Sequence, residues 1–138
     1  MALQQGATNA FATGLMNGVY NFTSGSFKMA LYTGSATLGP DTAVYTSLNE
    51  VVATGYTAGG IVLPVSVVPI SANNVSYISF SNVTWYGSIT ARGALIYQSG
   101  GSNPTVCVLD FGSDKTSVAS FTVQFPTADS TNAIIRIT

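Results

Sequence analysis

In a chain without histidine, carboxylates are the side chains best placed for acid–base chemistry at neutral pH, and they are few. The 138 residues include five acidic and four basic residues and no histidine. Catalytic triads, Cys-His pairs and His-metal sites need an imidazole, so the sequence excludes these classes of site. The closest acids in the sequence, Asp110 and Asp114, could form the carboxylate pair of a glycoside hydrolase. We favour a simpler interpretation, in which Asp110 ends a strand and Asp114 stabilises a turn through its own backbone.

Other reactive groups are equally sparse. The same two aspartates could contribute to a calcium site, but Ca²⁺ takes about six to eight oxygen ligands, and the five acids are scattered. Cys107 is the only cysteine and lies in the apolar segment 105–109, so we expect a buried, inert thiol. No glycine-rich loop has the spacing of a phosphate-binding motif. The sequence therefore predicts no enzymatic activity, no catalytic residue, no cofactor and no metal.

Charge and hydropathy point towards contacts with other protein. Only 7% of the residues are charged, 46% are hydrophobic and the net charge is −1. Without a run of basic residues we expect binding to neither nucleic acid nor a membrane surface. No apolar stretch approaches the roughly 18 to 20 residues of a membrane span, and the N-terminus lacks the pattern of a secretory signal. We expect synthesis in the cytoplasm and burial of apolar surface between subunits.

Hydrophobic periodicity predicts one helix followed by strands. Leu3, Ala7, Phe11 and Leu15 recur every four residues and indicate a helix over 3–19. Strands are then predicted at 27–33, 61–68, 75–85, 89–97, 105–111, 117–125 and 132–137, with 44–46 ambiguous. About eight short strands at this spacing are typical of an antiparallel β-sandwich, here jelly-roll-like. We expect one domain over 1–138, with an N-terminal helical segment at 1–20 and the sandwich at 26–138.

Aromatic and apolar side chains are the candidates for a binding surface. Tyrosine and tryptophan are favoured anchors of protein interfaces, because each combines a large ring with a polar tip. The interface candidates are Leu3, Phe11, Leu15, Tyr45, Tyr56, Trp85 and Tyr86. The same ring types also stack on sugars, so a carbohydrate-binding module stays open as an alternative.

Several blocks of sequence occur in an order that resembles a known group. They are 27–33 (FKMALYT), 43–45 (AVY), 49–51 (NEV), 55–60 (GYTAGG), 89–97 (ITARGALIY), 109–115 (LDFGSDK) and 127–136 (TADSTNAIIR). This arrangement resembles the small virion structural proteins of tailed bacteriophages. None of the blocks is a catalytic signature. The resemblance implies a structural component of the particle, similar to the capsid decoration or cement proteins that form trimers on the capsid lattice.

The resemblance carries expectations about partners and location. It implies that the chain binds the major capsid protein and itself, as a homotrimer, at the capsid surface of the virion. A tail or neck component is the alternative within the particle. We also expect the N-terminal segment to dock on a neighbour, so that deletion of residues 1–18 weakens attachment and leaves the sandwich folded.

Overall fold

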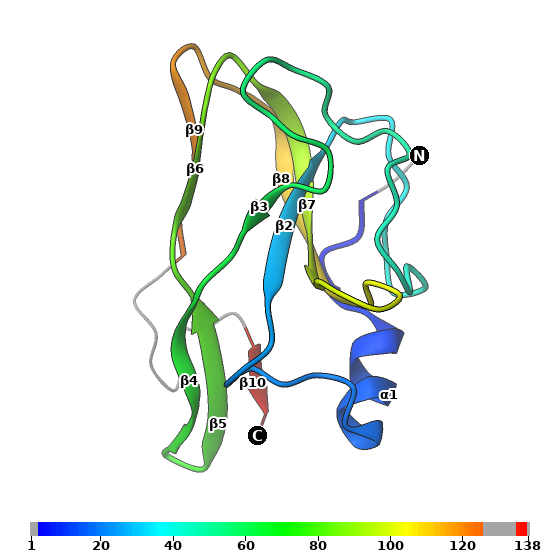
Figure 1. The fold of residues 1–138 in the computed structure, drawn as a ribbon, viewed down its shortest axis with the longest axis vertical. Coiled ribbons are helices and arrows are strands. Elements are labelled where there is room, and N and C mark those ends of the chain that lie inside the picture. The colour runs from blue at the N-terminus through cyan, green and yellow to red at the C-terminus, as the bar shows by residue number, and fades with distance from the viewer. Residues whose placement is uncertain (1–2, 126–134, 138) are drawn as a thin grey trace.

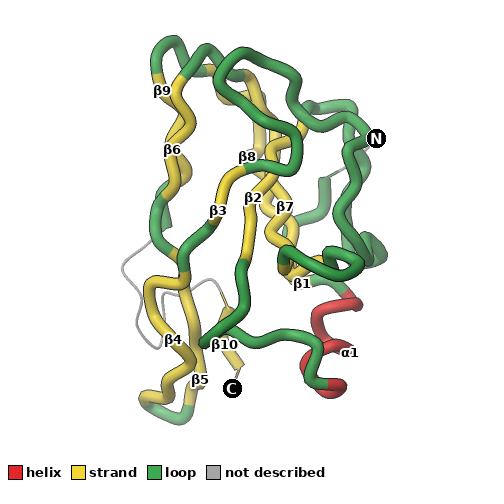
Figure 2. Tube along the Cα trace, in the orientation of Figure 1, coloured by secondary structure: helices red, strands yellow, loops and turns green. Residues whose placement is uncertain are grey.

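The computed structural model describes residues 3–125 and 135–137, and its strands form antiparallel sheets with one short helix. The predicted β-sandwich class is confirmed. Figures 1 and 2 show the β4–β5 hairpin and helix α1 at one end of the molecule and the β6–β9 ribbon at the other. In chain order the elements are β1 (Gly6–Ala7), α1 (Asn9–Asn17), β2 (Phe27–Tyr32), β3 (Ile61–Val62), β4 (Val65–Ala72), β5 (Val75–Phe80), β6 (Val83–Tyr86), β7 (Thr90–Gln98), β8 (Thr105–Thr116), β9 (Ser120–Val123) and β10 (Ile135–Ile137).

The larger sheet has five strands in the order β1-β8-β7-β2-β3. Its centre is the long pairing of β7 with β8 and of β2 with β7, which sets Ala30 opposite Leu95 and Leu95 opposite Val108. These side chains are fully buried. Because both faces of β2 are covered, its sequence reads as a nearly continuous apolar run rather than a strict alternation.

The second layer consists of two ladders, β10-β5-β4 and β6-β9. The sequence predicts one strand over 75–85, and the structure divides it at Ser81 and Asn82. The Ser81 N–H donates to the Pro64 carbonyl oxygen at 2.9 Å, and the Asn82 side chain accepts from the Phe125 N–H at 2.7 Å. At this point the chain therefore changes its pairing partner. The predicted strand at 61–68 divides in the same way, because β3 pairs with β2 and β4 pairs with β5.

The β4–β5 hairpin turns through Asn73 and Asn74. Both asparagines have positive φ, 54° and 64°, and Ala72 pairs directly with Val75. A two-residue turn with positive φ at both positions matches the right-handed twist of the flanking strands. Asparagine tolerates this conformation better than most residues, which explains the Asn-Asn pair.

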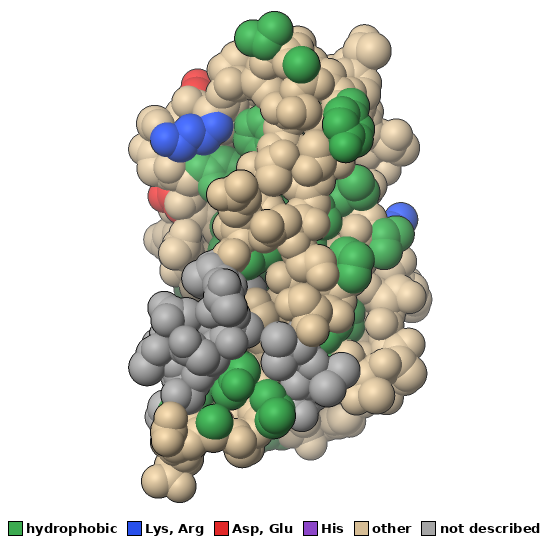
Figure 3. All heavy atoms as spheres, turned by 90° about the vertical axis from the view of Figure 1, so that its left-hand side faces the viewer, with side chains coloured by type: hydrophobic (Ala, Val, Ile, Leu, Met, Phe, Trp, Pro, Cys, Tyr) green, Lys and Arg blue, Asp and Glu red, His purple; other side chains and the backbone are tan. Residues whose placement is uncertain are grey.

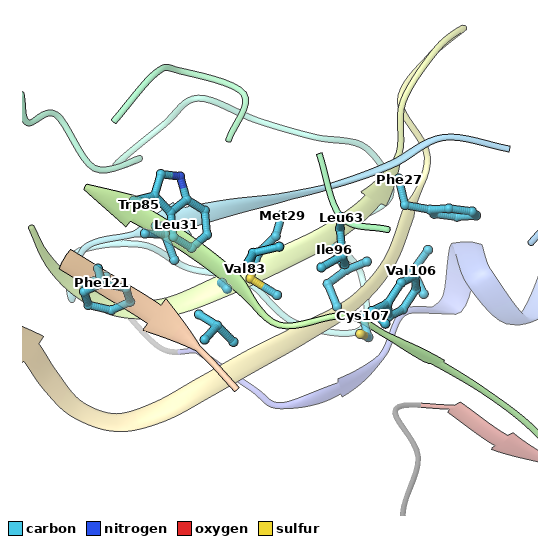
Figure 4. Packing of buried hydrophobic residues seen from close by; sticks show 14 of the residues in the cluster. Phe27, Met29, Leu31, Leu63, Val83, Trp85, Ile96, Val106, Cys107 and Phe121 are labelled. Atoms are coloured by element: carbon cyan, nitrogen blue, oxygen red, sulfur yellow. The ribbon is translucent and has the colours of Figure 1, made fainter. Parts of the chain in front are cut away.

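A main hydrophobic cluster lies between the two layers, as Figure 4 shows. Alternate residues of β2, namely Phe27, Met29 and Leu31, point into it. Trp85 and Phe121 enter it from the facing β6–β9 ribbon, with ring centroids 6.3 Å apart. A second, smaller cluster on the other face of the large sheet holds Ala30, Tyr32, Ala36, Leu38, Leu95, Tyr97 and Val108. The loop after β2 supplies Ala36 and Leu38, so a loop covers the outer face of the sheet.

The helix is shorter than predicted. It begins after Thr8, whose hydroxyl accepts from the Phe11 N–H at 3.1 Å, and it ends at Gly18, whose φ of 74° forms a left-handed cap. Gly6 and Ala7 instead pair with β8. The expected helical start at residue 3 is wrong because this stretch finds its backbone partners in neighbouring chain segments.

Two of the other predicted strands also change. The ambiguous segment 44–46 makes only one isolated bridge, from Val44 to Pro104. At the C-terminal end, β10 covers Ile135–Ile137, and the first part of the predicted strand 132–137 lies outside the described residues.

Candidate functional site

Asp110 and Asp114 lie within one long strand and not around a turn. β8 continues to Thr116, and Gly112, with φ of 84°, sits where the register with β7 shifts. The Asp110 carboxylate accepts from the Gly112 N–H at 2.8 Å and pairs with the Arg92 guanidinium at 3.5 Å. The prediction that Asp110 ends a strand is wrong, because a glycine bulge lets the strand run on. The carboxylate instead holds the bulge.

Reactive groups do not gather elsewhere in the part of the chain that the structure describes. Over residues 3–125 and 135–137, no three Cys, Asp or Glu side chains come together as metal ligands. Cys107 is buried, and this burial raises the pKa of its thiol to about 12. The protonated thiol is the unreactive form at neutral pH.

The most elaborate polar arrangement surrounds Glu50, the one glutamate of the sequence. Its side chain is buried. The Tyr45 hydroxyl donates to Oε1 at 2.5 Å, the Gly59 N–H donates to Oε2 at 2.8 Å, and the Tyr56 hydroxyl also donates to Oε2. Three donors on one carboxylate stabilise its charge without a cation. We call Glu50, Tyr32, Tyr45, Tyr56 and Tyr97 the Glu50 centre.

The tyrosines of the Glu50 centre fasten the loop at 43–60 to the large sheet. The Tyr32 hydroxyl donates to the Thr46 carbonyl at 2.6 Å, and the Tyr97 hydroxyl donates to the Gly59 carbonyl at 2.5 Å. The Tyr45 and Tyr97 rings stack with centroids 4.9 Å apart. Every phenol of the centre thus bonds to the loop or projects from it.

This loop also completes the edge of β2. β3 pairs only with Lys28 and Met29, which leaves the rest of β2 without a neighbouring strand on that side. There the Leu31 N–H donates to the Tyr56 hydroxyl at 2.9 Å, and the Leu31 carbonyl accepts from the Val51 N–H at 2.9 Å. The loop therefore takes the place of a strand at this edge, through a backbone bridge between Tyr32 and Glu50 and through the Tyr56 hydroxyl.

Burial also shifts the pKa of these phenols. Desolvation raises the pKa of Tyr32, Tyr45 and Tyr56 far above the ordinary value, and the Glu50 carboxylate raises each of them further. Neutral phenols at physiological pH act as fixed hydrogen-bond donors. The signal in the sequence that could have found the centre is a lone glutamate in a tyrosine-rich segment.

Three interface candidates are part of the protein's own core. Phe11, Tyr56 and Trp85 are 4%, 8% and 4% exposed, and all three belong to the main cluster. Their assignment to a partner surface is corrected. Trp85 is buried because strand alternation turns it inward and turns Tyr86 outward. Phe11 is buried because its ring packs edge-on against Tyr20 and Phe22.

Of the other four candidates, two are held by contacts within the protein and two are accessible to solvent. Leu3 forms a bridge with Leu38 and packs on the second cluster, and Tyr45 is held by Glu50. Leu15 is 39% exposed and Tyr86 is 76% exposed. Leu15 and Tyr86 are therefore the candidates that a partner could contact.

The structure also exposes large apolar side chains that the sequence analysis missed. Met16, Leu48, Val52 and Val118 are between 72% and 96% exposed. Val52 directly follows the buried Val51. Consecutive side chains of an extended segment point to opposite sides, and this alternation could have predicted that Val52 is exposed. Figure 3 shows hydrophobic side chains distributed over one face of the molecule with very few charged groups.

Two of the surface hollows lie beside elements that carry candidate residues or a strand edge. A small apolar groove of about 140 Å³ lies between α1 and β5, lined by Phe11 and Leu15 on one side and Ile78 on the other. A larger groove of about 450 Å³ lies between the end of β8 and β9, with Phe111 and Lys115 on the β8 side. The larger groove has the size of a ligand or peptide site.

Comparisons with known proteins add no relative. The chain matches no protein-family model, and no curated protein or solved structure matches it. Among the described residues, no helix is long and apolar enough to cross a membrane.

Proposed function

We propose that this chain is a virion structural protein of the capsid-decoration type, which binds a major capsid protein and other copies of itself and catalyses no reaction. The observation that carries the proposal is how the side chains are distributed. The Glu50 carboxylate is used inside the fold and Asp110 is paired with Arg92, whereas large apolar side chains project into solvent. Such a surface is suited to fitting against protein.

The exposed apolar residues support this role through their distribution. Met16 lies at the end of α1, Val52 in the loop of the Glu50 centre and Val118 in the turn between β8 and β9. Interface cores are depleted of charge and enriched in apolar and aromatic side chains. Several small apolar contacts from separate elements suit a protein that bridges neighbours in a lattice, where many weak contacts act together.

The carbohydrate-binding alternative has less support. Of the ring platforms that it requires, Trp85 and Tyr56 are buried in the core and Tyr86 is the exposed one. Binding of the isolated protein to a glycan array would favour that alternative over ours.

The structure also changes the experiment that tests attachment. Thr8 and Phe11 belong to the interior, and the Thr8 hydroxyl is bonded within the buried network around Thr105. Deletion of residues 1–18 would therefore remove part of the core, and the expectation that the sandwich folds without this segment is withdrawn. Point variants at exposed positions test binding without this damage.

Co-sedimentation with capsids assembled from the major capsid protein alone is the direct test. We expect the wild-type protein to sediment with the capsids, and at least one of Met16→Asp, Val52→Asp and Val118→Asp to lose binding, because an unpaired charge in an interface is costly. Thr23→Asp, at an exposed polar position, is the matched control. Absence of wild-type binding contradicts the proposal, and electron microscopy of the particle separates head from tail or neck.

A further inference from the structure

Most described sheet edges are poor templates for another strand. β1 and β3 have two residues each, and β10 carries Arg136. β4 is longer, but it contains Pro69 and two register shifts. Short length, charge, proline and bulges are the ways in which natural sheets prevent unwanted pairing at their edges.

The neighbouring edges of β6 and β8 are also protected. The loop at Thr54 and Gly55 packs so closely on β6 that a Cβ at Gly55 would lie 2.0 Å from the Tyr86 carbonyl oxygen. Beyond its pairing with β1, the edge of β8 contains the Gly112 bulge and the charged residues Asp110, Asp114 and Lys115. β9 is short, but it carries no charge, proline or bulge, and no described strand is hydrogen-bonded to its outer edge.

The register of the β6–β9 ribbon shows which backbone groups point outward. The Gly87 N–H donates to the Ala119 carbonyl at 2.9 Å, so this opposed pair is a hydrogen-bonded one. Hydrogen-bonded and non-hydrogen-bonded pairs alternate along an antiparallel ladder. Phe121 therefore bonds to β6, whereas the N–H and C=O groups of Ser120 and Thr122 face away from it. The 2.8 Å contact between the Thr84 and Thr122 hydroxyls fits the closer, non-hydrogen-bonded type of pair.

The large groove runs along this same edge. Five consecutive residues, 120–124, line it on the β9 side. The face of a strand presents alternate residues, so a lining of consecutive residues indicates that the groove follows the backbone edge. Phe111, Lys115 and Thr116 of β8, with Ser117 just after it, form the opposite wall. An added strand would lie beside outward-facing backbone donors and acceptors.

We propose that the outer edge of β9 pairs antiparallel with β9 of a second copy, about a two-fold axis, and extends the ribbon into a four-stranded sheet. Pairing centred on Phe121 sets Ser120 of each copy opposite Thr122 of the other, so the outward backbone groups complement themselves. Residues 116–125 contain no charge, and two identical strands can therefore meet without repulsion. A self-complementary patch is what a two-fold interface requires.

The size of the contact sets its strength. Two four-residue strands bury less than the roughly 1,000 Å² of a stable interface, although the exposed Val118 lies beside them. We therefore expect a concentration-dependent dimer rather than a permanent one. This inference rests on the sheet geometry and not on capsid binding, and it gives a dimer where the phage resemblance implies a trimer.

Sedimentation velocity of the full-length protein over a range of concentrations tests the pairing. The wild-type protein should shift from monomer to dimer as concentration rises. Thr122→Pro removes an outward N–H and no ladder bond, so it should abolish the shift, whereas Thr122→Val keeps the N–H and should retain the dimer. A wild-type protein that stays monomeric, a trimer, or equal behaviour of the two variants overturns the proposal.

Amide hydrogen exchange of the wild-type protein tests it without any substitution, should Thr122→Pro fail to fold. The amides of Ser120 and Thr122 should exchange fast in dilute solution and become protected as concentration rises, while the Phe121 amide is protected throughout. Protection of Ser120 and Thr122 at every concentration would mean that the chain covers its own edge. Fast exchange at every concentration would mean that no copy binds there. Either result overturns the proposal.

Discussion

Past Met29 the edge of β2 is covered by the loop at 43–60, whereas the outer edge of β9 faces a groove with no described strand beside it. At the first edge, the Tyr56 hydroxyl and the Val51 N–H bond to Leu31 and take the place of a strand. At the second, alternate backbone groups of Ser120 and Thr122 have no partner among the described residues. The two edges belong to different layers of the same sandwich.

The difference shows what it takes to cover an edge with a loop. The loop backbone covers part of the edge, because the Val51 N–H bonds to Leu31 and the Thr33 N–H bonds to Asn49. Where the loop offers no backbone acceptor, a side chain must take its place, and that side chain then needs a partner of its own. Tyr56 bonds to Leu31 and in turn to Glu50, whose carboxylate also holds Tyr45 and Gly59. Buried polar groups cost stability unless they are paired. Glu50, one of the few acidic residues of this chain, thus accepts the hydrogen bonds of tyrosines that cover the edge of β2.

The largest expected effect is at the Glu50 carboxylate. Glu50→Ala leaves the buried Tyr56 hydroxyl and the part-buried Tyr45 hydroxyl and Gly59 N–H without their acceptor, and an unpaired buried donor costs about 1–3 kcal/mol. We expect a loss of about 3 kcal/mol or more in the free energy of unfolding, measured by urea denaturation. Glu50→Gln keeps one carbonyl oxygen and should lose less.

Tyr86→Phe is the matched control for that series. Tyr86 is also a tyrosine but projects into solvent, and exposed substitutions usually stay within about 0.5 kcal/mol. A Glu50→Ala protein as stable as Tyr86→Phe would show that the loop does not depend on the Glu50 centre.

Alkaline pH should weaken the covered edge next. Burial raises the folded-state pKa of Tyr32, Tyr45 and Tyr56, so these phenols hold their protons more tightly in the folded chain than in the unfolded one. Their contribution to stability is complete below the unfolded pKa of about 10 and is lost as pH rises above it. Urea midpoints should fall from about pH 9 to about pH 11, with tyrosinate absorbance appearing together with unfolding. Tyr56→Phe should flatten this dependence, and an unchanged slope would contradict it.

The fold class could be predicted because it depends on short-range patterns. Alternation in β2 and β7, and turn residues such as Gly100–Gly101, mark where strands run and end without knowledge of their partners. The prediction failed where the chain changes partner. Ser81 and Asn82 break a continuous strand pattern because Pro64 and Phe125 happen to lie beside them, and Gly112 permits a bulge where its sequence suggests a turn.

The candidate surfaces were harder to predict for a related reason. An aromatic residue in a strand faces the core or solvent according to its register, so Trp85 and Tyr86 exchange roles with a one-residue shift. Glu50 is buried because two tyrosines of its own loop, Tyr45 and Tyr56, and two of the large sheet, Tyr32 and Tyr97, come together around that loop. The composition of the chain predicted a protein with little acid–base chemistry. Which aromatic rings are buried and which are exposed depends on the strand register, which composition does not give.

The smallest expected effect is on the open edge. Thr122→Val removes one hydroxyl from the exposed pair with Thr84 and keeps a β-branched side chain that favours strands. We expect the free energy of unfolding of the dilute monomer to change by no more than about 0.5 kcal/mol. A loss as large as that of Glu50→Ala would show that the surface hydroxyls of the β6–β9 ribbon stabilise the fold as strongly as the buried centre does. In that case the side chains of β9 would be needed to stabilise the monomer itself. Only the outward-facing backbone groups of this strand would then be available for pairing with a second copy.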